Sequence, residues 1–338
     1  MSDWYIYRGT AEPHDGIETL PPPPLWRSFT AGSRLPVPSY RPQDAHRAIS
    51  YRPTAEAIEQ VNAALYLRRP LLVTGRPGTG KSQLADSVAF ELGLGPVLHW
   101  PITSQVTLRA GLYHYDPLTR LYRQSRAEAE GGGTDDDIGE FIRLGPLGTA
   151  LLPHDRPRVL LIDEIDKSDI DLPNDLLTVF EKGEYEIPEL SRLESETASV
   201  MTADSGSGRV PVTRGVVQCQ AFPLVIMTSN DEREFPPAFL RRCVKVRLPQ
   251  PDAERLGMIV QAHLGPELSE QSRDLIERFL RRREIRELAT DQLLNAVYLL
   301  SHTNLSGEDR LQLAERITPY LDPGEDEEET DEVGRHVV

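Results

Sequence analysis

The sequence lacks the features that mark membrane-spanning, exported and disulfide-stabilised proteins. Among its 338 residues, no apolar run approaches the ~18 residues that a membrane-spanning helix requires. Residues 1–9 lack the basic and apolar regions of a signal peptide. Only two cysteines are present, Cys219 and Cys243, and neither has His or Cys neighbours at the spacing of a metal site. We therefore expect a cytoplasmic protein with no membrane anchor and no disulfide framework.

Basic residues are scarce relative to acidic ones. The chain has 37 Lys and Arg against 53 Asp and Glu, a formal net charge of −16. A surface of this charge repels a phosphate backbone, which argues against a nucleic-acid partner and against a nucleic-acid motor. The hydrophobic fraction of 39% is ordinary for a globular protein, and the length is sufficient for about two domains.

The composition divides the chain into four segments. We predict a Pro- and aromatic-rich extension at 1–45, an α/β nucleotide-binding domain at 46–250, a helical lid domain at 251–318 and a disordered acidic tail at 319–338. Four consecutive prolines at 21–24 favour polyproline II in the extension. Trp26 and Phe29 are its expected anchors, either in a strap on its own domain, which we favour, or on a neighbouring molecule. The aromatic start of the extension, including Trp4 and Tyr7, and the acidic tail are candidate partner elements.

The second segment alternates between predicted strands and helices, the pattern of an α/β layered fold. Thr54 is placed to cap a helix over 55–67, and a second helix is expected over 82–92. Continuous apolar runs indicate strands that are covered on both faces. We expect these strands at 71–74, 96–100, 158–163, 223–229 and 243–248.

Two interruptions and a helical region complete the pattern. Residues 128–139 predict a flexible acidic loop, and Leu193 to Arg214, with its Gly-Ser repeat, predicts a mobile insertion. Amphipathic periodicity predicts three helices of the C-terminal domain, at 253–263, 269–283 and 291–301.

Residues 75–82, Gly-Arg-Pro-Gly-Thr-Gly-Lys-Ser, match the phosphate-binding pattern G-x-x-x-x-G-K-[ST] between a predicted strand and a predicted helix. Glycines let backbone N–H groups turn inward around a polyphosphate, and the helix N-terminus adds partial positive charge. Lys81 would reach the β- and γ-phosphates, and the Ser82 hydroxyl would ligate Mg²⁺. A plain Gly-rich turn is the alternative, but strand, loop and helix in register favour a nucleoside triphosphate site.

Polar residues end the next two buried strands. Asp163 at the tip of one strand is placed to hold Mg²⁺, and Glu164 beside it to take a proton from an attacking water. An acidic residue at the end of a buried strand is costly unless it serves a cation. Asn230 follows the other strand, where its amide would bind the γ-phosphate and the attacking water; a turn residue is the alternative interpretation.

Two arginines, Arg241 and Arg242, follow a short predicted helix just before the last strand. A guanidinium aimed at the γ-phosphate of a neighbouring subunit accelerates hydrolysis by ~10³–10⁵-fold. Both arginines would equally favour the C-terminus of that helix, and the sequence does not separate the two interpretations.

Together these blocks resemble the AAA+ ATPases, specifically the MoxR family, over roughly 49–300. The resemblance rests on 69–82 as Walker A, 160–169 as Walker B, the helix and hairpin at 174–189, 227–230 as sensor 1 and 239–243 as the arginine-finger segment. It implies a P-loop AAA+ core with a five-stranded parallel sheet flanked by helices, plus a small C-terminal α-helical lid. It also implies a hexameric ring that binds ATP and Mg²⁺ between subunits.

The resemblance carries over to individual residues. The nucleotide-binding set is Gly75, Pro77, Gly78, Thr79, Gly80, Lys81, Ser82 and Gln83. Ser82 and Asp163 would bind the metal, and Glu164, Asn230 and Arg242, with Arg241 as second choice for the finger, would be catalytic. Residues 107–116 look like the insertion in helix 2, which tends to face the ring's pore or its clients.

MoxR-like proteins are similar in pairing with von Willebrand factor A domain proteins, which implies a chaperone-like remodelling role. The sequence departs from the family pattern at 288–293. Family members often carry an arginine there, called sensor 2, which couples the lid to the γ-phosphate, but this segment has none, and Arg283 or Arg286 would have to take its place. An ATP-gated assembly or signalling scaffold with slow hydrolysis is therefore the alternative function.

Overall fold

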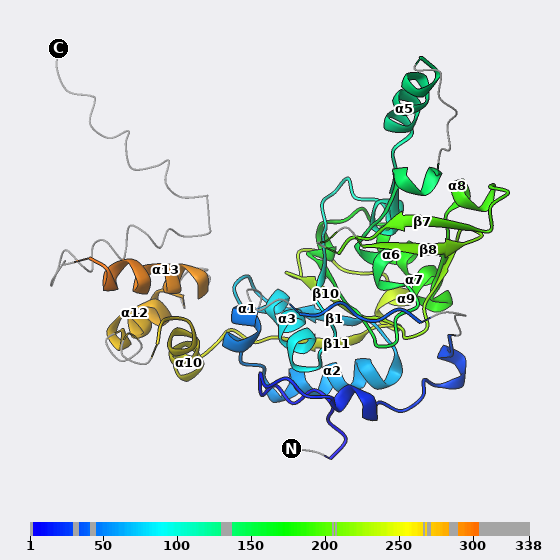
Figure 1. The fold of residues 1–338 in the computed structure, drawn as a ribbon. Helices are drawn as coiled ribbons and strands as arrows, with labels where there is room; N and C mark the ends of the chain where they lie inside the picture. The colour runs from blue at the N-terminus through cyan, green and yellow to red at the C-terminus, as the bar shows by residue number, and fades with distance from the viewer. Residues whose placement is uncertain are drawn as a thin grey trace, which may run out of the picture. The chain divides into compact units, whose positions relative to one another are not determined.

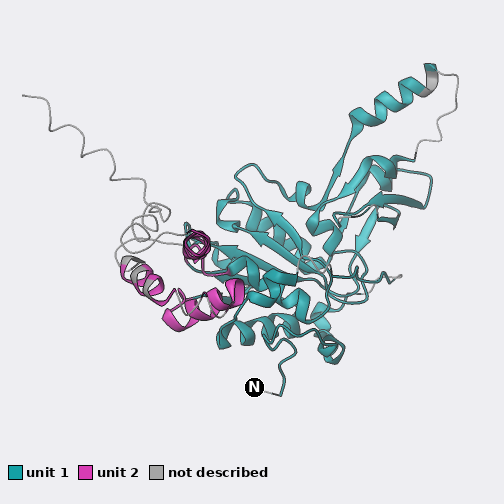
Figure 2. Cartoon of the chain, turned by 60° about the vertical axis from the view of Figure 1, so that its left-hand side comes forward, with its two compact units in different colours: residues 1–75, 81–248 teal, residues 76–80, 249–338 magenta. Residues whose placement is uncertain are grey.

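The structure, a computed structural model, describes residues 3–29, 34–40, 45–129, 137–204, 206, 208–265, 268, 272–283 and 290–303. The chain divides into two compact units (Figure 2). One contains Met1–Gly75 and Lys81–Leu248; the other contains Arg76–Gly80 and Pro249–Val338. Within the described residues, no helix is long and apolar enough to cross a membrane.

The centre of the first unit is a five-stranded sheet in the order β11-β1-β10-β5-β2, with all pairs parallel (Figure 1). Its strands are β1 (Leu71–Thr74), β2 (Leu98–Pro101), β5 (Val159–Asp163), β10 (Leu224–Ser229) and β11 (Val244–Arg247). The predicted five-stranded parallel sheet flanked by helices is confirmed. Because the strands are parallel, their carboxyl ends all lie at one edge of the sheet and their amino ends at the other.

Both faces of this sheet are buried, as the continuous apolar runs predict. Within β1, Leu71 and Val73 join one core cluster, which includes side chains of α2 (Ala55–Leu67) and α3 (Lys81–Glu91). Leu72, between them, joins the cluster on the opposite face. The side chain of Thr54 caps α2 by accepting the N–H of Ala57 at 3.1 Å.

Shorter helices complete this unit. They are α1 (Ala45–Ser50), α4 (Leu108–Leu112), α5 (Pro117–Ala129), α6 (Pro146–Ala150), α7 (Leu172–Lys182), α8 (Pro188–Ser191), α9 (Pro237–Leu240) and the 3-10 turns η1 (Gly16–Thr19), η2 (Leu25–Arg27), η4 (Ile138–Phe141) and η5 (Ile165–Lys167). α5 extends away from both sheets (Figure 1).

A second sheet, which the sequence did not predict, has the order β3-β4-β7-β8-β9-β6. Its strands are β3 (Tyr113–Tyr115), β4 (Ile142–Leu144), β6 (Glu184–Glu186), β7 (Thr197–Met201), β8 (Arg209–Thr213) and β9 (Val216–Gln218). All its pairs are antiparallel except β4 with β7.

The second sheet corrects one prediction and part of another. Leu193 to Arg214 contains the paired strands β7 and β8, and Ala198, Val200 and Val212 bury one face of this hairpin. The prediction of a mobile insertion at this place was therefore wrong. In the predicted acidic loop, 130–136 lie outside the described residues. Its last part is ordered, since the Asp137 side chain accepts the N–H of Gly139 and begins η4.

The N-terminal residues pack as a strap on α2 and α3. The Asn62 amide oxygen in α2 accepts two strap N–H groups, at 2.7 and 3.0 Å. The buried Glu91 carboxylate at the end of α3 accepts four more, at 2.6 to 3.1 Å. Tyr7 is fully buried, so it is not a partner contact. Phe29 is buried as an anchor, but Trp26 is 79% exposed, so the prediction that both anchor the strap on its own domain is wrong for Trp26.

The second unit contains α10 (Ala253–Leu264), α12 (Arg273–Arg283) and α13 (Thr290–Ser301). One apolar face of each helix meets in a small core that includes Leu256, Phe279 and Leu293. α12 is described from 273, while its predicted start at 269 lies outside the described residues. The predicted acidic tail also lies outside them.

Candidate nucleotide site

The glycine-rich loop joins β1 to α3, which begins at Lys81. Gly75, Gly78 and Gly80 have φ angles of 150°, 74° and 84°, which side chains disfavour. The Thr79 hydroxyl donates to the carbonyl of Arg76 at 2.9 Å and tightens the turn. Of the other predicted nucleotide contacts, Pro77 is exposed and Gln83 is half-buried at the start of α3.

Lys81 is 8% exposed, and its ammonium group links the loop to the sheet. Nζ donates to the carbonyl of Gly75 at 2.6 Å and to Oδ1 of Asn230 at 2.7 Å. Burial lowers the pKa of Lys81, and the nearby carboxylates, first that of Asp166, oppose this shift. The structure thus brings two predicted site residues, Lys81 and Asn230, into direct contact.

Asp163 lies at the end of β5 among three donors. Its Oδ1 accepts the hydroxyls of Ser82 (2.7 Å) and Thr228 (2.6 Å), and its Oδ2 lies 3.2 Å from Nε2 of His99. Burial alone would raise the pKa of Asp163, but the hydrogen bonds from His99, Thr228 and Ser82 outweigh it and lower the pKa to about 2. This carboxylate is therefore ionised at neutral pH.

The arrangement of Ser82 and Asp163 fits Mg²⁺. A hydroxyl and a carboxylate 2.7 Å apart supply two hard oxygen ligands, and magnesium bound with a nucleotide takes its others from phosphates and water. Within the described residues, no group of three or more His, Cys, Asp or Glu side chains forms a dedicated metal cluster elsewhere. The two predicted metal ligands, Ser82 and Asp163, are adjacent because they are hydrogen-bonded to each other.

Glu164 follows Asp163 in a left-handed conformation, with φ 61° and ψ 50°. A non-glycine residue in this region costs about 1 kcal/mol or more and is typical of functional sites. Its N–H donates to Oγ1 of Thr228 at 2.8 Å, and its half-exposed carboxylate pairs with Nζ of Lys167 at 2.8 Å. The geometry presents the Glu164 carboxylate outward, held by one exposed lysine.

Asp166 positions the end of β10. Its Oδ2 accepts the N–H groups of Asn230 (2.8 Å) and Glu232 (3.3 Å), while its buried Oδ1 has no hydrogen-bond partner. A buried carboxylate oxygen without a partner is costly and is typical of a site that binds a ligand or water. Asp166 therefore fixes the backbone that carries the Asn230 amide.

Four residues of this cluster were not predicted individually, His99, Asp166, Lys167 and Thr228, although the last three stand in the segments 160–169 and 227–230 that carry the resemblance. His99 is in β2, which pairs with β5, and Thr228 is in β10, on the other side of β5. Only the strand order reveals that they flank Asp163. Asp166 and Lys167 follow Glu164 closely in the sequence, so the pattern Asp-Glu-x-Asp-Lys was the signal from which their place in the site could have been predicted.

The two arginines lie elsewhere. Arg242 pairs through Nε with Oε1 of Glu181 at the end of α7, and its Nη1 donates to the carbonyl of Ala238 at 3.2 Å. The side chain of Arg241 is exposed, and its carbonyl accepts Nη1 of Arg69 at 3.4 Å. Both precede β11, so they lie at the amino edge of the sheet, opposite Asp163 and Asn230.

A P-loop between β1 and α3, with a carboxylate and an amide at the ends of the neighbouring strands, defines a P-loop nucleotide hydrolase. Residues 70–243 match the family model of the AAA domain, dynein-related subfamily. Because the match covers more than half of the chain, the chain belongs to this family and is an ATP-hydrolysing P-loop ATPase. No curated protein matched the chain.

Proposed function

We propose that the chain is a MoxR-like AAA+ ATPase that hydrolyses ATP in a ring, six-membered by the family resemblance, to remodel a partner protein. The observation that supports this proposal is that the predicted catalytic residues lie at two opposite edges of one sheet. The carboxyl edge holds Lys81, Asp163, Glu164 and Asn230, and the amino edge holds Arg241 and Arg242. MoxR-like ATPases are among the members of the dynein-related group.

At the carboxyl edge, the loop N–H groups and Lys81 would hold the β- and γ-phosphates. Ser82 and Asp163 would hold Mg²⁺, which neutralises developing phosphate charge when it is bound. The Asn230 amide would align the attacking water, and Glu164 would accept its proton after leaving Lys167. Lys81 already contacts Asn230, so the phosphate and the water would be positioned by one connected network.

The amino edge supports catalysis across a subunit boundary. A strand of four residues is about 13 Å long. An arginine that precedes β11 is therefore separated by at least this strand length from residues that follow β5 and β10. Neither arginine contacts Lys81, Asp163 or Glu164 in the described part of the chain. Arg242 would therefore act on the γ-phosphate of a neighbouring subunit, with Arg241 as the second candidate. A complete active site would then require two neighbouring subunits of the ring.

The partner protein is inferred from the resemblance and from the exposed side chains of α5. Residues 107–116, which resemble the helix-2 insertion, lead through β3 into α5, which extends away from both sheets (Figure 1). α5 exposes Leu118, Leu121 and Tyr122, and such an apolar strip is suited to a protein client. A von Willebrand factor A domain protein is the client class that the family resemblance implies.

Glu164→Gln tests the proposal. Glutamine keeps the size of the side chain but cannot accept the proton of the water. We expect ATP binding to be retained and turnover to fall at least ~10²-fold. Glu194→Gln, an exposed acidic residue remote from the cluster, is the matched control and should keep full turnover. Full turnover in Glu164→Gln would remove Glu164 as the base, and a client retained by the stalled variant would identify the substrate.

A second function, an ATP-gated assembly scaffold with slow hydrolysis, is favoured by one observation. The start of α13, Thr290-Asp291-Gln292-Leu293, carries no arginine that would couple a lid helix to the γ-phosphate. The side chain of Arg283 and all of Arg286 lie outside the described residues. Turnover measured against protein concentration separates the two functions. A remodelling enzyme should show turnover that rises with assembly and with client, whereas a scaffold should assemble with ATP and turn over slowly.

A further inference from the structure

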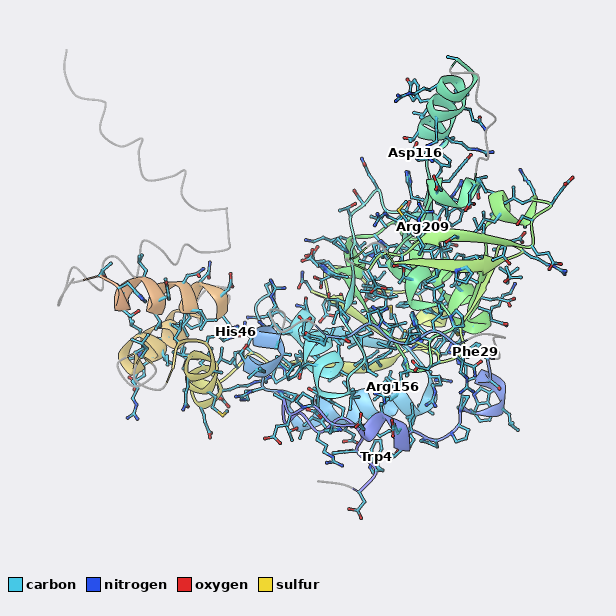
Figure 3. All side chains as sticks on the ribbon, in the orientation of Figure 1. Trp4, Phe29, His46, Asp116, Arg156 and Arg209 are labelled. Carbon is cyan, nitrogen blue, oxygen red and sulfur yellow. The ribbon has the colours of Figure 1, made fainter. Side chains whose placement is uncertain are left out.

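Two large apolar side chains of the strap point into solvent. Leu25 is 93% exposed and Trp26 is 79% exposed, on the short turn η2. By contrast, Phe29, three residues after Trp26 and labelled in Figure 3, is buried. Large exposed apolar side chains that lie next to each other, a tryptophan among them, are a feature of surfaces that contact other molecules.

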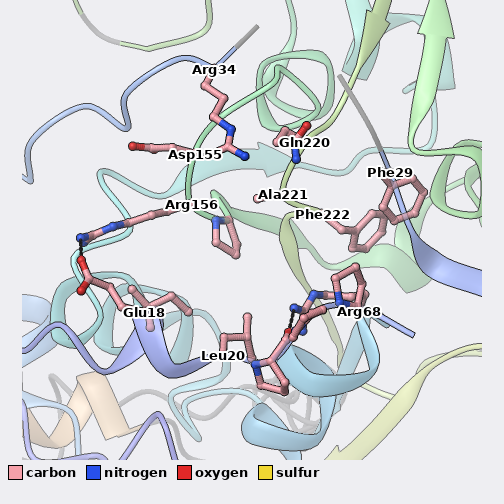
Figure 4. Close-up of a pocket in the computed structure, with 15 residues that line it drawn as sticks. Glu18, Leu20, Phe29, Arg34, Arg68, Asp155, Arg156, Gln220, Ala221 and Phe222 are labelled. Atoms are coloured by element: carbon pink, nitrogen blue, oxygen red, sulfur yellow. Dashed lines mark hydrogen bonds and ion pairs between the residues drawn. The ribbon is translucent and has the colours of Figure 1, made fainter. Parts of the chain in front are cut away.

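The turn that carries these residues is held firmly. Arg27 is 9% exposed; its Nη1 donates to the carbonyl of Phe180 at 2.7 Å, and its guanidinium lies 5.5 Å from the centre of the Phe222 ring. Phe29 stacks on Phe222 at 5.3 Å. Before the turn, Arg68 donates to the carbonyl of Pro21 at 2.6 Å (Figure 4). Anchors on both sides and a proline run therefore fix where Leu25 and Trp26 project.

The strap borders a pocket of about 530 Å³ in its own chain (Figure 4). Its apolar lining includes Leu20, residues 21–23 and Phe222, but neither Leu25 nor Trp26 belongs to it. This pocket, which the same strap lines, is thus not occupied by the two exposed side chains. Among the described residues, neither side chain is covered, so the question is which molecule would cover them.

The location of the turn identifies that molecule. Arg27 donates to Phe180 in the last turn of α7, and the next residue, Glu181, is the ion-pair partner of Arg242. Phe29 contacts Gly183, which caps the same helix. The exposed pair Leu25 and Trp26 therefore lies beside the arginine segment at the amino edge of the sheet. If Arg242 reaches the ATP of a neighbouring subunit, the surface around it must face that subunit.

We propose that Leu25 and Trp26 form an apolar contact with the neighbouring copy of this chain, next to the arginine segment. The inference rests on the proposed ring and assigns the strap a part in it. A second copy is the occupant because only a copy of this chain supplies the nucleotide that the arginines must meet. The strap then couples assembly to catalysis, since the turn and Arg242 are both fixed to the end of α7.

Sedimentation velocity with a non-hydrolysable ATP analogue tests the contact. For Leu25→Ala/Trp26→Ala we expect the protein concentration at half-assembly to rise by at least ~10-fold, as for a central aromatic contact. The matched control is Leu118→Ala/Tyr122→Ala, which removes similarly exposed apolar surface from α5 and should assemble as the unaltered chain does. Equal assembly of the strap variant and the unaltered chain would overturn the inference.

Tryptophan emission gives a second readout that does not depend on weakening the assembly. The chain has three tryptophans, and subtracting the spectrum of Trp26→Phe isolates the signal of Trp26 from those of Trp4 and Trp100. On assembly this signal should shift to shorter wavelength and become protected from acrylamide quenching. An unchanged Trp26 signal in an assembled ring would overturn the contact while leaving the ring proposal intact. Absence of any assembly of the unaltered chain would overturn both.

Discussion

The two edges of the parallel sheet differ in how complete they are. At the carboxyl edge, short hydrogen bonds within a single chain already join two pairs of residues, Lys81 with Asn230 and Ser82 with Asp163. At the amino edge, Arg242 is held by Glu181 of its own chain, and its side chain stays half-exposed. The comparison supports the proposal that one chain carries a phosphate site together with a separate arginine that would serve the site of a neighbouring chain. Activity should therefore depend on assembly as well as on the P-loop.

The largest effect is expected at the carboxyl edge. Lys81→Ala removes the ammonium group that links the loop to Asn230 and leaves the phosphates without their principal positive charge. We expect loss of both ATP binding, measured by calorimetry, and turnover. Lys167→Ala is the control, because Lys167 is an exposed partner of Glu164 and its removal should leave ATP binding intact. ATP bound normally by Lys81→Ala would contradict the prepared phosphate site.

The amino edge should respond differently. Arg242→Ala should retain ATP binding, because the residue lies across the sheet from its own site. Turnover should fall by ~10³–10⁵-fold, the contribution of an arginine supplied in trans. Steady-state turnover at a concentration where the unaltered chain assembles is the measurement. If only Arg241→Ala has this effect, the finger is the exposed neighbour. Little effect from either variant would leave the amino edge without a catalytic role.

A smaller loss of turnover is expected when Asp166 is substituted. This variant tests how the Asn230 amide is positioned at the carboxyl edge. Asp166→Asn keeps the shape but weakens the charge-assisted hydrogen bond to the Asn230 N–H. The loss of about 1.5–3 kcal/mol should lower kcat by ~10–100-fold. ATP affinity should change little, because Asp166 contacts the backbone of Asn230. An equal loss of affinity and kcat would indicate general disruption of the site instead of misplacement of the Asn230 amide.

The smallest effect concerns Cys243, next to Arg242. Burial raises the pKa of its thiol to about 12, and Sγ donates to the carbonyl of Phe239 at 3.3 Å. A raised pKa leaves the thiol protonated at pH 8, so alkylation should be slow and should rise about tenfold per pH unit up to the pKa. An ATP analogue should not alter the rate if the backbone of the arginine segment is already ordered. Rapid labelling at pH 8 would show that this segment opens.

Much of the nucleotide-binding core could be predicted because its signals are local. Each strand of the parallel sheet is a continuous apolar run, and the loop motif directly follows β1. The second sheet could not be predicted, since strands of three to five residues pair across long sequence separations, as Tyr113 does with Leu144. Gly and Ser at 205–208 suggested a mobile segment, although the alternation of polar and apolar residues at 197–200 was a strand signal beside it.

The site shows the same division between local and distant signals. Asp163 and Glu164 follow an apolar run, so their place at a strand end could be predicted. His99 and Thr228 could not, because only the strand order β10-β5-β2 brings them to Asp163. Trp26 was expected as an anchor because its neighbours are aromatic and proline-rich. Packing on Phe222 is instead achieved by Arg27 and Phe29, which leaves Trp26 exposed.

Mixed assemblies test the central claim most directly. Arg242→Ala subunits have an intact carboxyl edge, and Glu164→Gln subunits have an intact arginine. If ATP is hydrolysed between chains, a 1:1 mixture should regain turnover that neither variant has alone, at the boundaries where an Arg242→Ala site meets an unaltered Arg242. A mixture in which both variants co-assemble yet turnover stays at the sum of the separate values would contradict an active site shared between subunits.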